Sequence, residues 1–116
     1  MNLAKRIVEV LEKNSINILS TEKQGKEYCT ELEFYSNAGE DFVFCVFHDR
    51  TMKSFADMFE VYAIDFDPDE HAEMWIEARN RVSGVPSSIR SLIDDADDIK
   101  DTLENVATEL NNVVYA

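Results

Sequence analysis

The strongest constraint on the fold is a change in hydrophobic period near Thr51. Before it, EYCTELEFYS (27–36) alternates between two faces, and DFVFCVFHD (41–49) is rich in aromatic and β-branched residues. Both segments are typical of antiparallel strands. After it, Phe55, Met58, Phe59 and Tyr62 recur at the spacing of a helix. The chain is therefore expected to place a small sheet before a helical half.

The two strands predict a hairpin with NAGE at its tip, because Asn and Gly tolerate the positive φ that such turns need. If Asn37 pairs with Glu40, then Phe34 lies opposite Val43 and Leu32 lies opposite Cys45. This register places the following residues on one face, which helices must cover: Leu32, Phe34, Val43, Cys45 and Phe47.

The remaining elements follow from the same patterns. A helix is predicted over 2–13, a short strand around Ile16 and Ile18, and helices over 69–81 and 87–113, with Gly84 and Pro86 between the last two. The final helix carries one continuous apolar stripe: Ile89, Leu92, Ile93, Ala96, Ile99, Leu103, Val106, Ala107 and Leu110. We expect a single α+β domain over 1–116, a helix, a three-stranded antiparallel sheet and three helices, with the helices packed on one sheet face.

Charge restricts the partners. The 116 residues carry a formal net charge of −13, with a balance of +2 over 1–26 and −15 over 27–116. Such a surface repels nucleic acid and anionic membrane and attracts basic proteins, although net charge also serves solubility alone. The sequence has no apolar run of membrane-spanning length, its N-terminus does not resemble a signal peptide, and Cys29 and Cys45 lack a metal-ligand spacing. We expect a cytoplasmic protein with reduced cysteines.

Three aspartates alternate in IDFDPDEH, at Asp65, Asp67 and Asp69. An apolar run followed by DFDPD is similar to the nucleophile motif of haloacid-dehalogenase-like phosphatases, but that motif follows a parallel strand and VYAI completes a helical stripe. The trio also matches ligand positions of a calcium loop, which requires Gly where Glu70 stands and Glu where Ile76 stands. The third interpretation is a helix boundary, in which Pro68 ends one helix and Asp69 caps the next.

Other candidate chemistry is sparse. His48 and His71 have no nucleophile and acid beside them in sequence, and the three glycines form no phosphate-binding loop. We therefore expect no catalytic residue, no metal site and no cofactor. The aromatic content of FVFCVF exceeds what one face of a small sheet normally buries. Its second face either packs in the core or binds a partner or a second copy.

The outer face of the final helix is acidic. Asp94, Asp97 or Asp98, Asp101 and Glu104 recur every three or four residues, which places neighbours about 5–6 Å apart. This spacing is of the same order as that of phosphates along a nucleic-acid strand. The row is either a solvated helix face or a set of charges that occupies a basic groove built for DNA.

Two resemblances follow from specific segments. The opening MNLAKRIVEVLEKNSINILSTEK, the NAGED tip and the next helix resemble the small acidic anti-CRISPR proteins of prophages that inhibit Cas9. This resemblance covers residues 1–80 and implies that Asn37, Glu40 and Asp41 reach toward the nuclease while later acidic residues replace phosphates. FDPDEHAEMWIEA and GVPSSIR are similar to a family of small acidic proteins carried by bacterial mobile elements, which implies a genetic setting and no mechanism.

The leading hypothesis is a non-enzymatic acidic binding protein that inhibits a host nucleic-acid-binding defence enzyme by DNA mimicry. The alternative is a structural or oligomerisation module, with a homodimer as its simplest form. A metal-dependent phosphoryl enzyme is the third hypothesis. The partner-binding residues expected under the first are Asn37, Glu40, Asp41, Asp65, Asp67, Asp69, Glu70, Asp94, Asp97, Asp98, Asp101 and Glu104.

Overall fold

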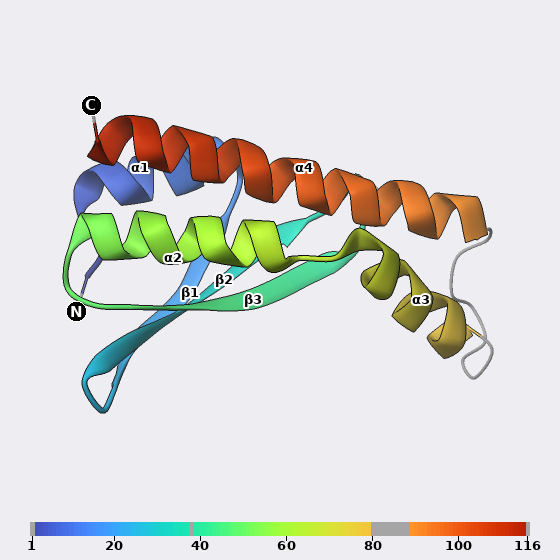
Figure 1. Cartoon of the computed structure of the whole chain (residues 1–116), viewed down its shortest axis with the longest axis horizontal. Coiled ribbons are helices and arrows are strands. Elements are labelled where there is room, and N and C mark those ends of the chain that lie inside the picture. Colours follow the sequence, from blue (N-terminus) through green and yellow to red (C-terminus); the bar gives the residue numbers. More distant parts are fainter. Residues whose placement is uncertain (1, 38, 80–88, 116) are drawn as a thin grey trace.

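The computed structural model describes residues 2–37, 39–79 and 89–115. The elements are α1 (Lys5–Lys13), β1 (Asn17–Gln24), β2 (Glu27–Tyr35), β3 (Asp41–His48), α2 (Met52–Asp65), α3 (Pro68–Arg79) and α4 (Ile89–Val114). The strands form one antiparallel sheet in the order β1-β2-β3. The predicted α+β class and element order are confirmed (Figure 1). The predicted helix break at Gly84 and Pro86 lies outside the described residues.

The predicted register of the β2–β3 hairpin is wrong by one residue. Tyr35 pairs with Asp41, so that Phe34 lies opposite Phe42 and not Val43. The loop is longer than the assumed turn: Ser36 N–H donates to the Glu40 carbonyl at 2.9 Å, and Gly39, at φ +89°, donates to the Ser36 carbonyl. Because side chains alternate along a strand, one extra loop residue moves every side chain of β3 to the other face.

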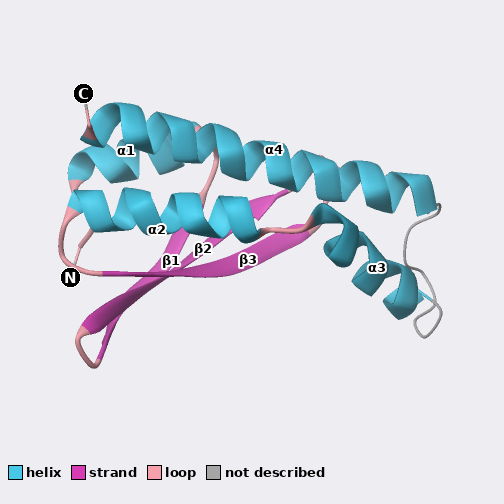
Figure 2. Ribbon diagram, in the orientation of Figure 1, coloured by secondary structure: helices cyan, strands magenta, loops and turns pink. Residues whose placement is uncertain are grey.

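This one-residue difference in register decides which β3 residues are buried. Val43 and Phe47, predicted to face the helices, are each 46% exposed, and Cys45 is half-buried. The core instead combines one sheet face with α1, α2 and α4, which lie on the same side of the sheet in Figure 2. The sheet residues of this core are Leu32, Phe34, Phe42, Phe44 and Val46.

Helix α4 organises the helical layer by running along both α1 and α2 (Figure 1). Its predicted stripe is buried at Leu92, Ala96, Ile99, Leu103, Val106, Ala107 and Leu110. Ile93 departs from the prediction, because it is 41% exposed, whereas Asp95 takes an inward position at 7% exposure. A carboxylate therefore stands within the buried stripe of the helix.

Candidate functional site

The aspartates of IDFDPDEH lie at the corner between α2 and α3. Asp65 is the last residue of α2, and Pro68 is the first of α3. The Oδ1 atom of Asp67 accepts the N–H groups of Asp69 at 2.9 Å and Glu70 at 3.4 Å. Asp67 therefore caps α3, and the prediction that Asp69 is the cap is wrong. Pro68 at the first helical position explains the shift, because this position requires no N–H donor.

This geometry bears on both chemical interpretations of the trio. Residues 61–64, which a phosphatase motif requires as a strand, belong to α2. Asp65, Asp67 and Asp69 are separated along a helix end, a two-residue link and a helix start. Within the part of the chain that the structure describes, no three His, Cys, Asp or Glu side chains converge as metal ligands. The corner carboxylates are thus exposed groups on the surface of a helix boundary.

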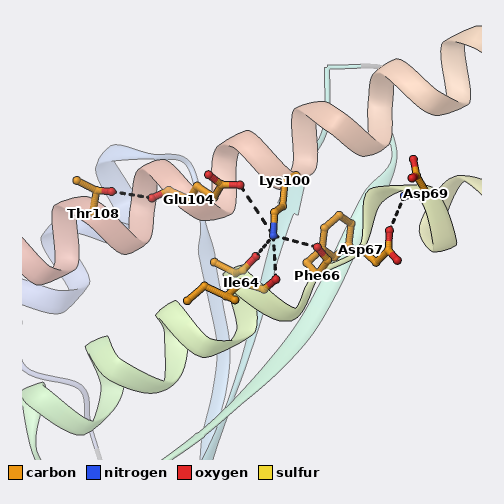
Figure 3. A network of polar contacts seen from close by, with 8 residues as sticks. Ile64, Phe66, Asp67, Asp69, Lys100, Glu104 and Thr108 are labelled. Carbon is orange, nitrogen blue, oxygen red and sulfur yellow. Dashed lines mark hydrogen bonds and ion pairs between the residues drawn. The ribbon is translucent and has the colours of Figure 1, made fainter.

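Lys100 of α4 reaches this corner and closes the end of α2 (Figure 3). Its Nζ atom donates to the carbonyls of Ala63, Ile64 (3.1 Å) and Phe66 (3.0 Å). These are carbonyl groups at the C-terminal end of a helix, where a cation is favoured by the helix dipole. Glu104 lies one turn along α4, 3.9 Å from the same Nζ. The Lys100 charge is therefore engaged in contacts within the chain, and its side chain is only 21% exposed.

An open depression lies beside the corner, between α2 and the first turns of α3. Its lining residues are Phe42, Tyr62, Asp65, Phe66, Asp67, Glu70, His71, Glu73 and Met74. Its apolar lining residues include Phe42, Phe66 and Met74, and its acidic ones are Asp65, Asp67, Glu70 and Glu73. A long basic side chain can lay its methylene stem on the apolar residues while its charged end meets the carboxylates.

The outer face of α4 carries the predicted acidic row. Asp94, Asp97, Asp101 and Glu104 are all exposed and lie three or four residues apart on one side of the helix. Glu104 also lines a groove between α2 and α4 together with Glu60, Ile64 and Lys100. Lys100, whose Nζ lies 3.9 Å from Glu104, also donates to the Phe66 carbonyl at the corner. We call the row on α4 and the carboxylates of the α2–α3 corner together the acidic surface.

Residues of the hairpin tip form hydrogen bonds with α3 and α4 of the same chain. The carboxylate of Asp98 accepts the backbone N–H of Asn37 at 3.1 Å and its Nδ2 at 2.8 Å. Glu40 accepts hydrogen bonds from His71 Nε2 at 2.9 Å and from Trp75 Nε1 at 2.6 Å, and its side chain is 13% exposed. Three residues expected to contact a partner thus contact other parts of the same chain.

The twelve predicted residues are divided among four places. Asp65, Asp67, Asp69 and Glu70 lie at the corner, and Asp94, Asp97, Asp101 and Glu104 lie on outer α4. Asn37, Glu40 and Asp98 bind within the molecule. Asp41 is the first residue of β3 and pairs with Tyr35 on the sheet face that points away from the core.

Sequence reasoning did not identify Lys100 as a structural cation, although one signal was present. Between Ile93 and Leu103, Lys100 is the one basic residue among five acidic ones. An isolated base on an acidic helix is a candidate for a fixed internal contact. The exposed Val43 and Phe47 were missed because the predicted register buried them.

The two histidines are both hydrogen-bonded. His48 is 2% exposed; its Nδ1 donates to the Asp49 carbonyl at 2.7 Å, and its Nε2 lies 2.6 Å from the Thr30 hydroxyl. Because Nδ1 is the donor, the neutral ring accepts the Thr30 proton at Nε2. His71 bridges to Glu40 as described above. Neither histidine has a hydrogen bond to a Cys or Ser side chain among the described contacts.

Comparisons with known proteins identified no matching family model, no similar curated protein and no similar solved structure. In the described residues, every helix is too short or too polar to cross a bilayer.

Proposed function

We propose that this chain is a non-enzymatic binding protein whose acidic surface occupies a basic groove on another protein. The observation that carries the proposal is the pair of exposed carboxylate groups on outer α4 and at the α2–α3 corner, which the contacts of Lys100 connect. Lys100, which lies between the two groups, directs its charge to the end of α2. The carboxylates of this surface are exposed, whereas Lys100 directs its charge inward.

The spacing of the row supports mimicry of nucleic acid by this surface. Residues three or four apart on a helix rise by about 4.5–6 Å, so the row from Asp94 to Glu104 extends over about 15 Å. Phosphates rise by about 3.4 Å along one strand of DNA, which is of the same order. A groove lined with Lys and Arg for phosphate contacts would meet a carboxylate at similar intervals. The finer form of the proposal is inhibition of a nucleic-acid-binding defence enzyme such as Cas9.

The test compares two variants with the same change in net charge. The first neutralises outer α4 through Asp94→Asn, Asp97→Asn, Asp101→Asn and Glu104→Gln. The control neutralises four acidic residues elsewhere on the helices through Glu9→Gln, Glu12→Gln, Asp57→Asn and Glu109→Gln. Partners captured from a bacterial lysate by the unmodified chain should be displaced by added duplex DNA and by salt. The α4 variant should lose them, and the control variant should retain them.

The Cas9 form is tested by measuring target-DNA binding of a Cas9–guide complex in the presence of each protein. Inhibition by the unmodified chain and the control variant, with loss in the α4 variant, is the expected result. Unchanged DNA affinity at low salt would contradict the Cas9 form. Captured partners that duplex DNA does not displace would contradict mimicry itself.

A structural or oligomerisation module is the second candidate. It is favoured by the exposed side chains of Tyr35, Val43 and Phe47 on the outward sheet face. This function predicts a concentration-dependent dimer in sedimentation, and a monomer at high micromolar concentration would contradict it.

A further inference from the structure

The sheet presents a second surface, distinct from the acidic surface on the helices. Residues that alternate away from the core on the three strands define it, and we call it the open face. They are Asn17, Ser20, Glu22, Gln24, Glu27, Cys29, Glu31, Glu33, Tyr35, Asp41, Val43, Cys45 and Phe47. Helices α1, α2 and α4 pack against the opposite face of the same strands. A partner on the open face is therefore independent of the one proposed for outer α4.

Large apolar side chains are exposed on the open face. Tyr35 is 63% exposed, and Val43 and Phe47 are each 46% exposed. Val43, Cys45 and Phe47 occupy alternate positions of β3, so they form one row along an edge strand. An aromatic ring in such a row is the type of residue that dominates protein–protein binding energy. This row could serve either a second copy or a different protein.

Carboxylates stand beside the row. Glu33 lies opposite Val43 on the neighbouring strand, and Glu31 lies opposite Cys45. Of the thirteen open-face residues, five are acidic and none is Lys, Arg or His; the acidic ones are Glu22, Glu27, Glu31, Glu33 and Asp41. A hydrogen bond with the nearby Asp41 and the charge of that group raise the pKa of Glu33. The charges of Asp41 and Glu33 likewise raise the pKa of Tyr35.

We propose that the open face docks a protein segment in which arginine side chains alternate with apolar ones. Stacking two copies through this face would bring ten carboxylates together without a base on the face to offset them, so charge disfavours a second copy. Arginine fits better than lysine, because its planar group can bind a carboxylate with two hydrogen bonds and also stack on an aromatic ring such as Tyr35 or Phe47. The apolar residues of the partner would cover Val43 and Phe47.

The probe for this proposal is an extended hexapeptide that alternates arginine with valine. Two control peptides replace arginine by glutamine or valine by serine, which separates the charged part of recognition from the apolar part. Binding to the full chain is followed by NMR through the methyl signals of Val43 and the ring signals of Tyr35 and Phe47. We expect these signals to shift with the arginine–valine peptide and not with either control peptide.

Three substitutions test where the peptide binds and whether charge contributes to its binding. Phe47→Thr removes the ring from the open face, and Ile64→Thr removes an apolar side chain that is 66% exposed on α2. We expect about a tenfold loss of peptide affinity for Phe47→Thr, as for a moderate interface anchor, and no change for Ile64→Thr. Glu33→Gln should weaken binding and reduce its dependence on salt.

Three results would overturn the proposal. Signals that shift only on α4 would show that the peptide binds the acidic surface. Equal affinity for the arginine–serine peptide would show that the exposed apolar row has no part in recognition. A dimer in sedimentation that Phe47→Thr converts to a monomer would show that a second copy occupies the open face. Each of these results leaves the function proposed for outer α4 to its own test.

Discussion

The carboxylate of Glu40 connects the hairpin tip to two helices. It accepts hydrogen bonds from His71 and Trp75 of α3, and Asp95 of α4, which is 7% exposed, is a further hydrogen-bond partner. Burial opposes ionisation of Glu40, but the hydrogen bonds with His71, Asp95 and Trp75 and the charge of His71 outweigh it. Together they hold the pKa of Glu40 below its ordinary value of 4.5.

This lowered pKa predicts a pH-dependent loss for Glu40→Gln. A carboxyl group whose pKa is lower in the folded state stabilises the fold above its unfolded pKa, and this stabilisation is lost as pH falls through the folded value. We expect Glu40→Gln to lower the free energy of unfolding by about 1–3 kcal/mol at neutral pH, the scale of hydrogen bonds to a charged group. The deficit should shrink below pH 4.5, the ordinary value for the group. Urea unfolding across this range measures it.

Glu73→Gln is the matched control, because Glu73 is an exposed glutamate on the same α3. Its cost should be a few tenths of a kcal/mol and nearly independent of pH. A deficit for Glu40→Gln that is equal at every pH would contradict the assigned role of its charge.

The contacts of Glu40 show which features of the site could not be predicted from the sequence. Glu40 follows Gly39 in a polar turn, and a polar turn residue is normally exposed. Its partners His71 and Trp75 lie 31 and 35 residues away, and Asn37 and Asp98 are 61 residues apart. Local patterns carry no information on such pairs. The corner was predicted correctly as a helix boundary, because helix ends depend on neighbouring residues, although the cap is Asp67 and not Asp69.

At the scale of elements, hydrophobic period was sufficient to predict the helices and strands but not the pairing of β3. The apolar stripe from Leu92 to Leu110 is buried with few exceptions. A long helix repeats its hydrophobic period over many positions, so one departure does not change which face is buried. The hairpin instead depended on one loop residue. Because Phe42, Val43, Phe44 and Cys45 are all suitable core residues, composition could not distinguish the two registers.

The link between α2 and α4 through Lys100 gives a prediction for Lys100→Met. Methionine keeps an unbranched apolar stem but cannot donate to the carbonyls of Ala63, Ile64 and Phe66. We expect a loss of about 1–2 kcal/mol in the free energy of unfolding, from the lost charged hydrogen bonds and the helix dipole. Amide hydrogen exchange at the end of α2 should accelerate, because Lys100 holds this end against α4.

Lys13→Met is the control for this change. Lys13 lies in the last turn of α1 and pairs with Glu109 at 3.5 Å, but its side chain is 72% exposed. Exposed ion pairs contribute at most about 1 kcal/mol and often much less. Equal losses for the two variants would show that Lys100 acts only as a surface charge.

At the scale of the whole molecule, negative charge covers two opposed surfaces. The acidic surface lies on α4 and the α2–α3 corner, and the open face lies on the far side of the sheet. Ion pairs are formed by Glu40, Glu104 and Glu109, but the 24 acidic and 11 basic residues leave a formal net charge of −13. Repulsion among the exposed carboxylates therefore opposes folding, and it does so most strongly at low ionic strength.

This repulsion predicts that salt acts with opposite signs on folding and on binding. Screening lengths fall from about 30 Å at 0.01 M to about 3 Å at 1 M, so added NaCl should raise the Tm of the chain alone. The same salt should weaken its hold on a basic partner, because attraction between opposite charges is screened equally. Thermal scans beside binding measurements over one salt series would show the two trends.

Ion identity separates screening from a bound cation. If screening alone acts, NaCl, KCl and MgCl2 should raise Tm equally at the same ionic strength. An added rise with Mg²⁺ or Ca²⁺ that Asp65→Asn or Asp69→Asn removes would instead indicate cation binding at the corner, where no three ligands converge among the described residues. A Tm that falls or stays constant with salt would contradict the repulsion itself. In that case the carboxylates would not form a field strong enough to attract a basic partner, and the function proposed for the acidic surface would fail with it.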